Sequence, residues 1–111
     1  MQIHQDTAAD VSVLRLEGRL DANTSKELEE RMLPLVGSQG AKLLVDCEDL
    51  AYISSAGLRV LLLAVKKAKR GGGQIALAGL NENVMEVFDI SGFSALFTIR
   101  PNREEGLAAL G

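Results

Sequence analysis

The sequence predicts an α/β fold: one domain with a small, mixed, mostly parallel β-sheet flanked by about four α-helices. Short β-rich runs alternate along the chain with longer segments of helical periodicity, and glycine-containing stops separate them. This alternation favours a largely parallel sheet with right-handed crossovers. The chain has 111 residues, 47% of them apolar, which suits one hydrophobic core. We therefore expect a single domain over residues 1–111.

The first third of the chain is expected to supply two strands and one helix. An edge strand begins near Ile3, and a second strand covers residues 11–17 until Gly18 breaks it. A tight turn between the two strands would make them antiparallel. The helix is expected over residues 25–36, and Pro34 should kink it or end it early, because proline removes a helical hydrogen bond.

The rest of the chain alternates strands with helices. An acidic loop, residues 46–49, is expected after the strand predicted over residues 41–45. Ile90 is expected on the buried face of the helix predicted over residues 82–90, together with Val84 and Phe88. The predicted strands are residues 41–45, 75–78 and 96–99, and the predicted helices are residues 55–70, 82–90 and 103–110.

Two serines, Ser54 and Ser55, stand where the first of these helices should begin. A hydroxyl there can accept a hydrogen bond from a free backbone N–H, and the helix dipole favours negative charge at that end. Capping alone is the commoner reason for such a serine. This pair, however, follows a strand and so lies at the carboxyl edge of the sheet, where open α/β folds bind ligands. Ala56 and Gly57 keep the surroundings small, so another protein's active site could reach a hydroxyl placed here.

Composition argues against several classes of function. The net charge of −3 and the absence of tryptophan disfavour nucleic-acid binding, which needs basic and aromatic surfaces. A single cysteine, Cys47, excludes an internal disulfide and a multi-cysteine zinc site. The chain shows no signal segment and no apolar run near the roughly 20 residues that span a bilayer. We therefore expect a cytoplasmic protein with no nucleic-acid or membrane partner.

Catalytic and metal sites find little support. Ser55 lacks the Gly-x-Ser-x-Gly elbow of a hydrolase nucleophile, and the only histidine, His4, lies far away near the N-terminus. Asp46, Glu48 and Asp49 could hold Mg²⁺, but a solvated acidic loop is the simpler interpretation. We expect no catalytic residue, no metal and no cofactor, and therefore no enzyme.

Three segments resemble one family. The run Gly-Arg-Leu-Asp-Ala-Asn-Thr at residues 18–24, the segment 43–58 that ends Ile-Ser-Ser-Ala-Gly-Leu, and the run Val-Phe-Asp-Ile-Ser-Gly-Phe at residues 87–93 resemble motifs of STAS domains. The likeness is to the bacterial anti-sigma factor antagonists in particular. The three segments keep the family's order and spacing across nearly the whole chain, so together they are more specific than each alone.

The resemblance implies a partner-switching function. In this family the unphosphorylated antagonist binds an anti-sigma factor that is also a serine kinase, and a sigma factor is released. Phosphorylation of the serine at the start of the helix, here Ser55, ends the binding, and a PP2C-type serine phosphatase reverses it. The family often has aspartate where this chain has Ser54 and a second hydroxyl residue where it has Ala56, so Ser54 is the second candidate for modification.

The partner surface is expected around this serine. Arg59 on the first helical turn could pair with an acidic group of the partner or be only a solvated residue, and Asn23 and Thr24 could simply cap the preceding helix. A competing function is an unphosphorylated STAS scaffold in a transport or stress-sensing complex, and a small enzyme is a third, disfavoured option. The residues expected to bind the partner are Asp21, Asn23, Thr24, Ser54, Ser55, Ala56, Gly57 and Arg59.

Overall fold

The computed structural model describes residues 1–111 and confirms the predicted alternation of strands and helices. Five strands form one sheet in the order β1-β2-β3-β4-β5; β1 and β2 are antiparallel, and all other neighbours are parallel. In chain order the elements are β1 (Gln2–Ala8), β2 (Val11–Leu20), α1 (Ser25–Met32), β3 (Lys42–Ile53), α2 (Ser55–Arg70), β4 (Gln74–Ala78), α3 (Glu82–Ser91), β5 (Thr98–Arg100) and α4 (Arg103–Leu110).

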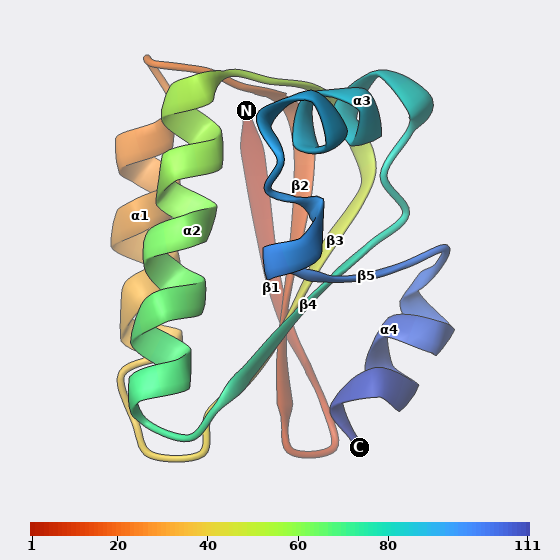
Figure 1. Cartoon of the computed structure of the whole chain (residues 1–111). Coiled ribbons are helices and arrows are strands. Elements are labelled where there is room, and N and C mark those ends of the chain that lie inside the picture. Colours follow the sequence, from red (N-terminus) through yellow and green to blue (C-terminus); the bar gives the residue numbers. More distant parts are fainter.

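Helices cover both faces of the sheet (Figure 1). Successive side chains of a strand point to opposite faces, so β3 contributes to two apolar clusters. Leu43 and Val45 belong to the larger cluster, which packs α1, α2 and α3 against the sheet, while Leu44 belongs to the smaller one with Leu110 of α4. Figure 1 shows α3 close to the N-terminal end of α2. The start of α2 and the end of α3 therefore lie at the same end of the molecule.

The first two strands form the predicted hairpin. β1 ends at Ala8 and β2 begins at Val11, which leaves a two-residue turn in which Ala9 has a φ of 55°. The prediction that Gly18 ends the second strand is wrong, because β2 continues to Leu20. Gly18 has a φ of 110°, and the register with β3 shifts on its C-terminal side. Glycine allows this backbone conformation without strain, so the strand bends rather than stops.

The predicted acidic loop is also wrong, since residues 46–49 lie inside a strand. β3 runs from Lys42 to Ile53, and its second half pairs with the extension of β2 as far as the partners Leu20 and Ile53. Asp46 is only 4% exposed and Cys47 only 1%. The parallel ladder with β2 satisfies the backbone of this stretch, and that pairing cannot be recognised from local composition.

One predicted boundary is confirmed and another is displaced. α1 ends at Met32, and a 3₁₀ turn over Leu33–Leu35 contains Pro34, so the predicted early end is confirmed. The predicted strand at residues 96–99 is displaced: Ser94–Leu96 forms a second 3₁₀ turn, and β5 covers only Thr98–Arg100.

The expected burial of Ile90 is wrong, because 78% of this residue is exposed. α3 packs through Val84 and Phe88, which lie one turn apart, and a residue two positions later points about 200° around the helix.

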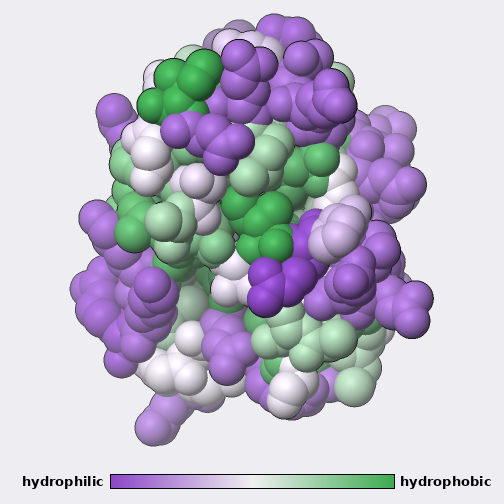
Figure 2. Space-filling view, turned by 45° about the vertical axis from the view of Figure 1, so that its right-hand side comes forward, coloured by the Kyte–Doolittle hydropathy of each residue, from purple (hydrophilic) through white to green (hydrophobic).

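The other large exposed apolar residues are Tyr52, Leu63 and Leu96. Figure 2 shows hydrophobic side chains in the middle of one face with hydrophilic ones around them. None of the helices has the length and apolar character needed to cross a membrane.

Candidate functional site

The two serines at the start of α2 have different roles. Ser54 is the N-cap residue with extended backbone angles, and its Oγ accepts a hydrogen bond from the N–H of Gly57, with 3.3 Å between the two atoms. Its own N–H donates to the carbonyl oxygen of Leu20 at 2.8 Å, which joins the start of α2 to the end of β2. Ser55 is the first helical residue; it is exposed, and its hydroxyl makes no hydrogen bond within the chain. The free hydroxyl of the pair is therefore that of Ser55.

Gly57 lets the helix approach the sheet closely. A Cβ atom on Gly57 would lie 2.5 Å from Cγ of Leu20, closer than such atoms pack, and 3.1 Å from the Leu20 carbonyl oxygen, which is a tight contact. Gly57 is buried and Ala56 is half-buried. Among the residues expected to bind a partner, Gly57 thus lies beneath the surface, where its small size holds the serine pair against β2.

The loop between β2 and α1 lies beside this helix start and is braced by its own side chains. The Oγ1 atom of Thr24 accepts a hydrogen bond from the N–H of Asp21 at 2.9 Å and donates to the carbonyl oxygen of Arg19 at 2.9 Å. The carboxylate of Asp21 accepts a bond from the N–H of Asn23 at 3.0 Å. The expected capping of α1 is wrong: Thr24 occupies the N-cap position, but its side chain makes no cap bond. Its hydroxyl instead fixes the shape of the loop.

A shallow groove extends from Ser55 toward the end of α3. Its volume is about 280 Å³, and it is lined by Ser55, Leu58, Arg59, Leu62, Ser91 and Phe93. Arg59 is exposed and is the only charged residue of this lining; its guanidinium makes no ion pair. The groove therefore combines an apolar floor, two hydroxyls and one unpaired cation.

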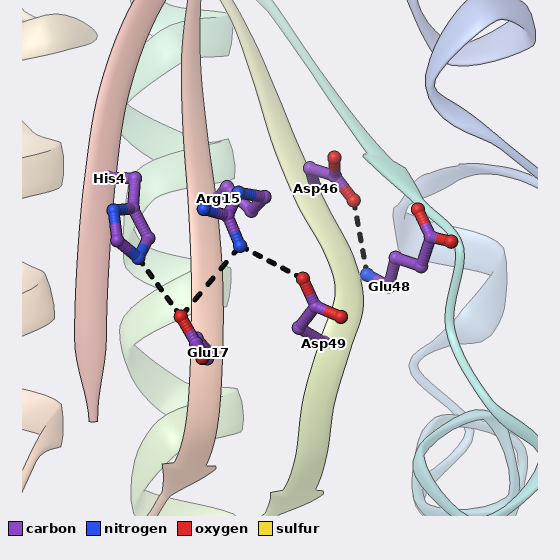
Figure 3. Close-up of polar contacts among 6 residues, drawn as sticks. All are labelled: His4, Arg15, Glu17, Asp46, Glu48 and Asp49. Atoms are coloured by element: carbon purple, nitrogen blue, oxygen red, sulfur yellow. Dashed lines mark hydrogen bonds and ion pairs between the residues drawn. The ribbon is translucent and has the colours of Figure 1, made fainter.

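The acidic side chains of β3 lie on the sheet face opposite α2 and do not converge on one point (Figure 3). Nη1 of Arg15 lies 2.9 Å from Oδ2 of Asp49 and 3.8 Å from Oε1 of Glu17. Asp46 is buried and accepts a hydrogen bond from the N–H of Glu48 at 3.1 Å. Asp46 and Asp49 are held by protein donors and the three carboxylates do not converge, so the arrangement does not resemble a magnesium site, which needs several oxygens directed at one ion.

Neither the histidine nor the cysteine is placed for catalysis. Nε2 of His4 lies 3.1 Å from Oε1 of Glu17 in the same cluster (Figure 3), on the other side of the sheet from α2 and its Ser55. Burial, and secondarily the nearby Asp46 carboxylate, raises the pKa of the Cys47 thiol to about 12. A buried, protonated thiol is not a nucleophile.

Sequence reasoning did not place several residues at this site. Leu62 lies four residues after the buried Leu58, a spacing that by itself predicts only a core position, and Phe93 belongs to a family motif, yet both line the groove with Ser55. The guanidinium of Arg19 stacks on the ring of Tyr52, with 4.2 Å from Cζ to the ring centroid. The Ser-Gly-Phe run at residues 91–93 was a usable signal for the groove, whereas the pairing of Arg19 with Tyr52 depends on the bulged register of β2 and β3.

Comparisons with known proteins identify the family and the fold of this chain. The model of the STAS domain family matches residues 2–106. The BtrV protein of Bordetella bronchiseptica is 34% identical over 98% of this chain and 94% of its own length. The anti-sigma-B factor antagonist of Bacillus subtilis is 33% identical over 85% of each chain. The anti-sigma factor antagonist SpoIIAA in its unphosphorylated form has the same fold, with a TM-score of 0.80 at 21% identity over 97% of this chain and 95% of its own.

The family match covers most of the chain, and two relatives exceed 30% identity over most of its length. Anti-sigma factor antagonists are regulators without enzymatic activity, in agreement with the prediction that this chain is not an enzyme. The chain belongs to the STAS domain family, and within it to the anti-sigma factor antagonists.

Proposed function

We propose that this chain binds an anti-sigma factor while Ser55 is unphosphorylated, and that phosphorylation of Ser55 ends the binding and lets the anti-sigma factor capture its sigma factor again. The observation that carries the proposal is the exposed, unbonded hydroxyl of Ser55 on the first turn of α2. Ser54 is the less suitable residue for phosphorylation, because its oxygen is already hydrogen-bonded to the N–H of Gly57. Family membership supplies the class of partner.

The modification requires a kinase, and the anti-sigma factor itself is proposed to be that kinase. Oγ of Ser55 forms a bond to the γ-phosphorus of ATP, the bond from that phosphorus to the β–γ bridging oxygen breaks, and ADP leaves. The hydroxyl proton passes to a base of the kinase. A PP2C-type serine phosphatase would hydrolyse the phosphoserine and restore the free hydroxyl.

The position of Ser55 explains how a phosphate could block binding without unfolding the domain. A phosphoserine carries about −1.5 to −2 charges at neutral pH. The dipole and free N–H groups at the start of α2 favour that charge, so the helix should persist. At the surface the phosphate would lie near the loop that contains Asp21 and would add repulsion and a desolvation cost to any close interface. About 1.4 kcal/mol is enough for a tenfold loss of affinity.

The proposed binding surface consists of the start of α2 and the braced loop before α1. Ser55, Asn23 and Arg59 are its exposed members, and Ser54, Asp21 and Thr24 support them from half-buried positions. We propose that the chain acts in the cytoplasm through protein partners alone, with no cofactor, no nucleic acid and no membrane.

Phosphorylation and mass spectrometry test the proposal. Incubation with the cognate anti-sigma factor and ATP should phosphorylate wild type and Ser54→Ala on Ser55, and should leave Ser55→Ala unmodified. In calorimetric titrations Ser55→Asp should lose binding to the anti-sigma factor at least tenfold while its circular dichroism stays that of wild type. Binding of Ser55→Asp as tight as that of wild type would disprove the switch. A chain that no kinase modifies would instead favour the scaffold function.

A further inference from the structure

We propose that Arg59 is the intramolecular counter-ion of the phosphate on Ser55, so that phosphorylation occupies the only cation of the groove. The inference deepens the proposed function and rests on Ser55 being the modified residue. It assigns to Arg59 a regulatory role in the phosphorylated state, in addition to the partner contact proposed for the unphosphorylated state.

Ser55 and Arg59 are spaced so that their side chains can meet. Ser55 and Arg59 are four residues apart on α2, and residues at this spacing are neighbours on the same face of a helix. Side chains of a helix lean toward its N-terminus, so the Arg59 side chain leans toward the turn that contains Ser55. An anion placed four residues before a cation is the favourable orientation for such a pair. Both residues line the same groove, which gives the phosphate and the guanidinium a shared space.

Arg59 is available to pair with a phosphate. Other arginines near the sheet are engaged: Arg15 is paired with Asp49, and Arg19 is stacked on Tyr52. Arg59 has no such partner, and no carboxylate lines the groove to compete with a phosphate. A guanidinium can donate two parallel hydrogen bonds to phosphate oxygens, which makes it the best phosphate partner among the side chains.

The groove that Ser55 and Arg59 share is otherwise lined mainly by apolar side chains. Leu58, Leu62 and Phe93 surround the two polar ends with apolar groups. These apolar groups offer the phosphate no competing hydrogen bond, and because Ser55 and Arg59 are both exposed, the pair should weaken with salt as other surface pairs do. In the unphosphorylated protein Arg59 remains free for a carboxylate of the partner. After phosphorylation the chain's own phosphate takes that place, so one modification both adds negative charge and withdraws the positive charge.

Phosphoserine incorporated at position 55 during translation tests this without any kinase. A titration followed by ³¹P NMR gives the second pKa of the phosphate. We expect this pKa to lie about 0.3 units lower in the Arg59 protein than in Arg59→Gln, a twofold change in proton affinity, since such helical pairs contribute about 0.2–0.5 kcal/mol. Arg59→Lys should keep most of the shift. Arg70→Gln, at an exposed position at the far end of the same helix, is the control and should leave the pKa unchanged.

A second measurement uses the wild-type side chains. The Nε–H resonance of Arg59 should move when phosphoserine replaces Ser55, and that of Arg70 should not. Equal phosphate pKa values in all four proteins, or an equal shift in Arg70→Gln, would overturn the assignment. Because the phosphoserine is incorporated during translation and not by a kinase, this outcome is distinct from failure of the proposed function, which would appear as a chain that its kinase does not modify at Ser55.

Discussion

The two adjacent serines should differ in how much stability is lost when each is replaced by alanine. Ser54→Ala removes the oxygen that accepts the N–H of Gly57. The loss of an N-cap costs about 0.5–2 kcal/mol, and the N-to-O distance of 3.3 Å exceeds the usual value of about 2.9 Å, so we expect about 0.5–1 kcal/mol. Ser55→Ala removes a hydroxyl without partners and should change stability by less than about 0.5 kcal/mol.

Urea denaturation followed by circular dichroism measures both values, and the slope of each transition should be unchanged. In thermal melts Ser54→Ala should lower Tm by about 2–8 °C, given a shift of about 4–8 °C per kcal/mol for a domain of this size. Ser54→Asp is the matched control, because an aspartate oxygen caps as well as a serine oxygen and should preserve stability. A larger loss from Ser55→Ala than from Ser54→Ala would refute the assignment of the cap to Ser54, and with it the argument that Ser55 is the free hydroxyl.

Two further predictions concern Gly57, which lets α2 approach β2 closely, and Cys47, whose thiol is buried. Gly57→Ala should destabilise the protein by about 1–3 kcal/mol, because its Cβ would meet Leu20 at 2.5 Å, although glycine-to-alanine changes normally favour a helix; a urea midpoint at or above that of wild type would contradict the close approach. Cys47 should not react with a thiol reagent at pH 8 until the chain unfolds. Because its pKa is raised to about 12 and an unfolded thiol ionises near about 8.5, the unfolded state loses the proton first, so stability should fall as the pH rises above about 8.5. In Cys47→Ala the free energy of unfolding should fall less steeply with pH above about 8.5. An equally steep fall in both proteins would show that the thiol is not the cause.

Helical periodicity was enough to locate α2 and its cap, because the information lies within one segment. Leu58, Leu61 and Val65 recur at helical spacing, and a hydroxyl stands where the first turn begins. The length of β3 could not be predicted in this way. Asp46 and Glu48 favour a loop by composition, but they lie in a strand because the bulged extension of β2 provides hydrogen-bond partners beside them. Strand pairing is a property of two distant segments, and neither segment encodes it alone.

The site was predictable to the extent that it lies at one helix terminus. The serine pair and Arg59 could be placed from the sequence, since spacing along a helix fixes their relative positions. The groove could not, because Phe93 and Ser91 come from the end of α3, and their approach to α2 depends on the packing of α3 through Val84 and Phe88. The exposure of Ile90 has the same cause: a short helix anchored by two residues leaves the residue on its opposite side in solvent.

The division of work between the two hydroxyls bears on how a switch can operate here without unfolding. A phosphate on Ser54 would sit on the oxygen that accepts the Gly57 N–H and would have to fit at a half-buried position where the Ser54 N–H is bonded to Leu20, so the cap geometry at the start of α2 would have to change. A phosphate on Ser55 breaks no bond of the folded chain, because that hydroxyl has none. Its effect is then confined to charge at the surface, where Arg59 and the loop containing Asp21 are the nearest elements that can respond. A switch of this kind reverses as soon as the phosphate is removed, since no part of the fold has to be rebuilt.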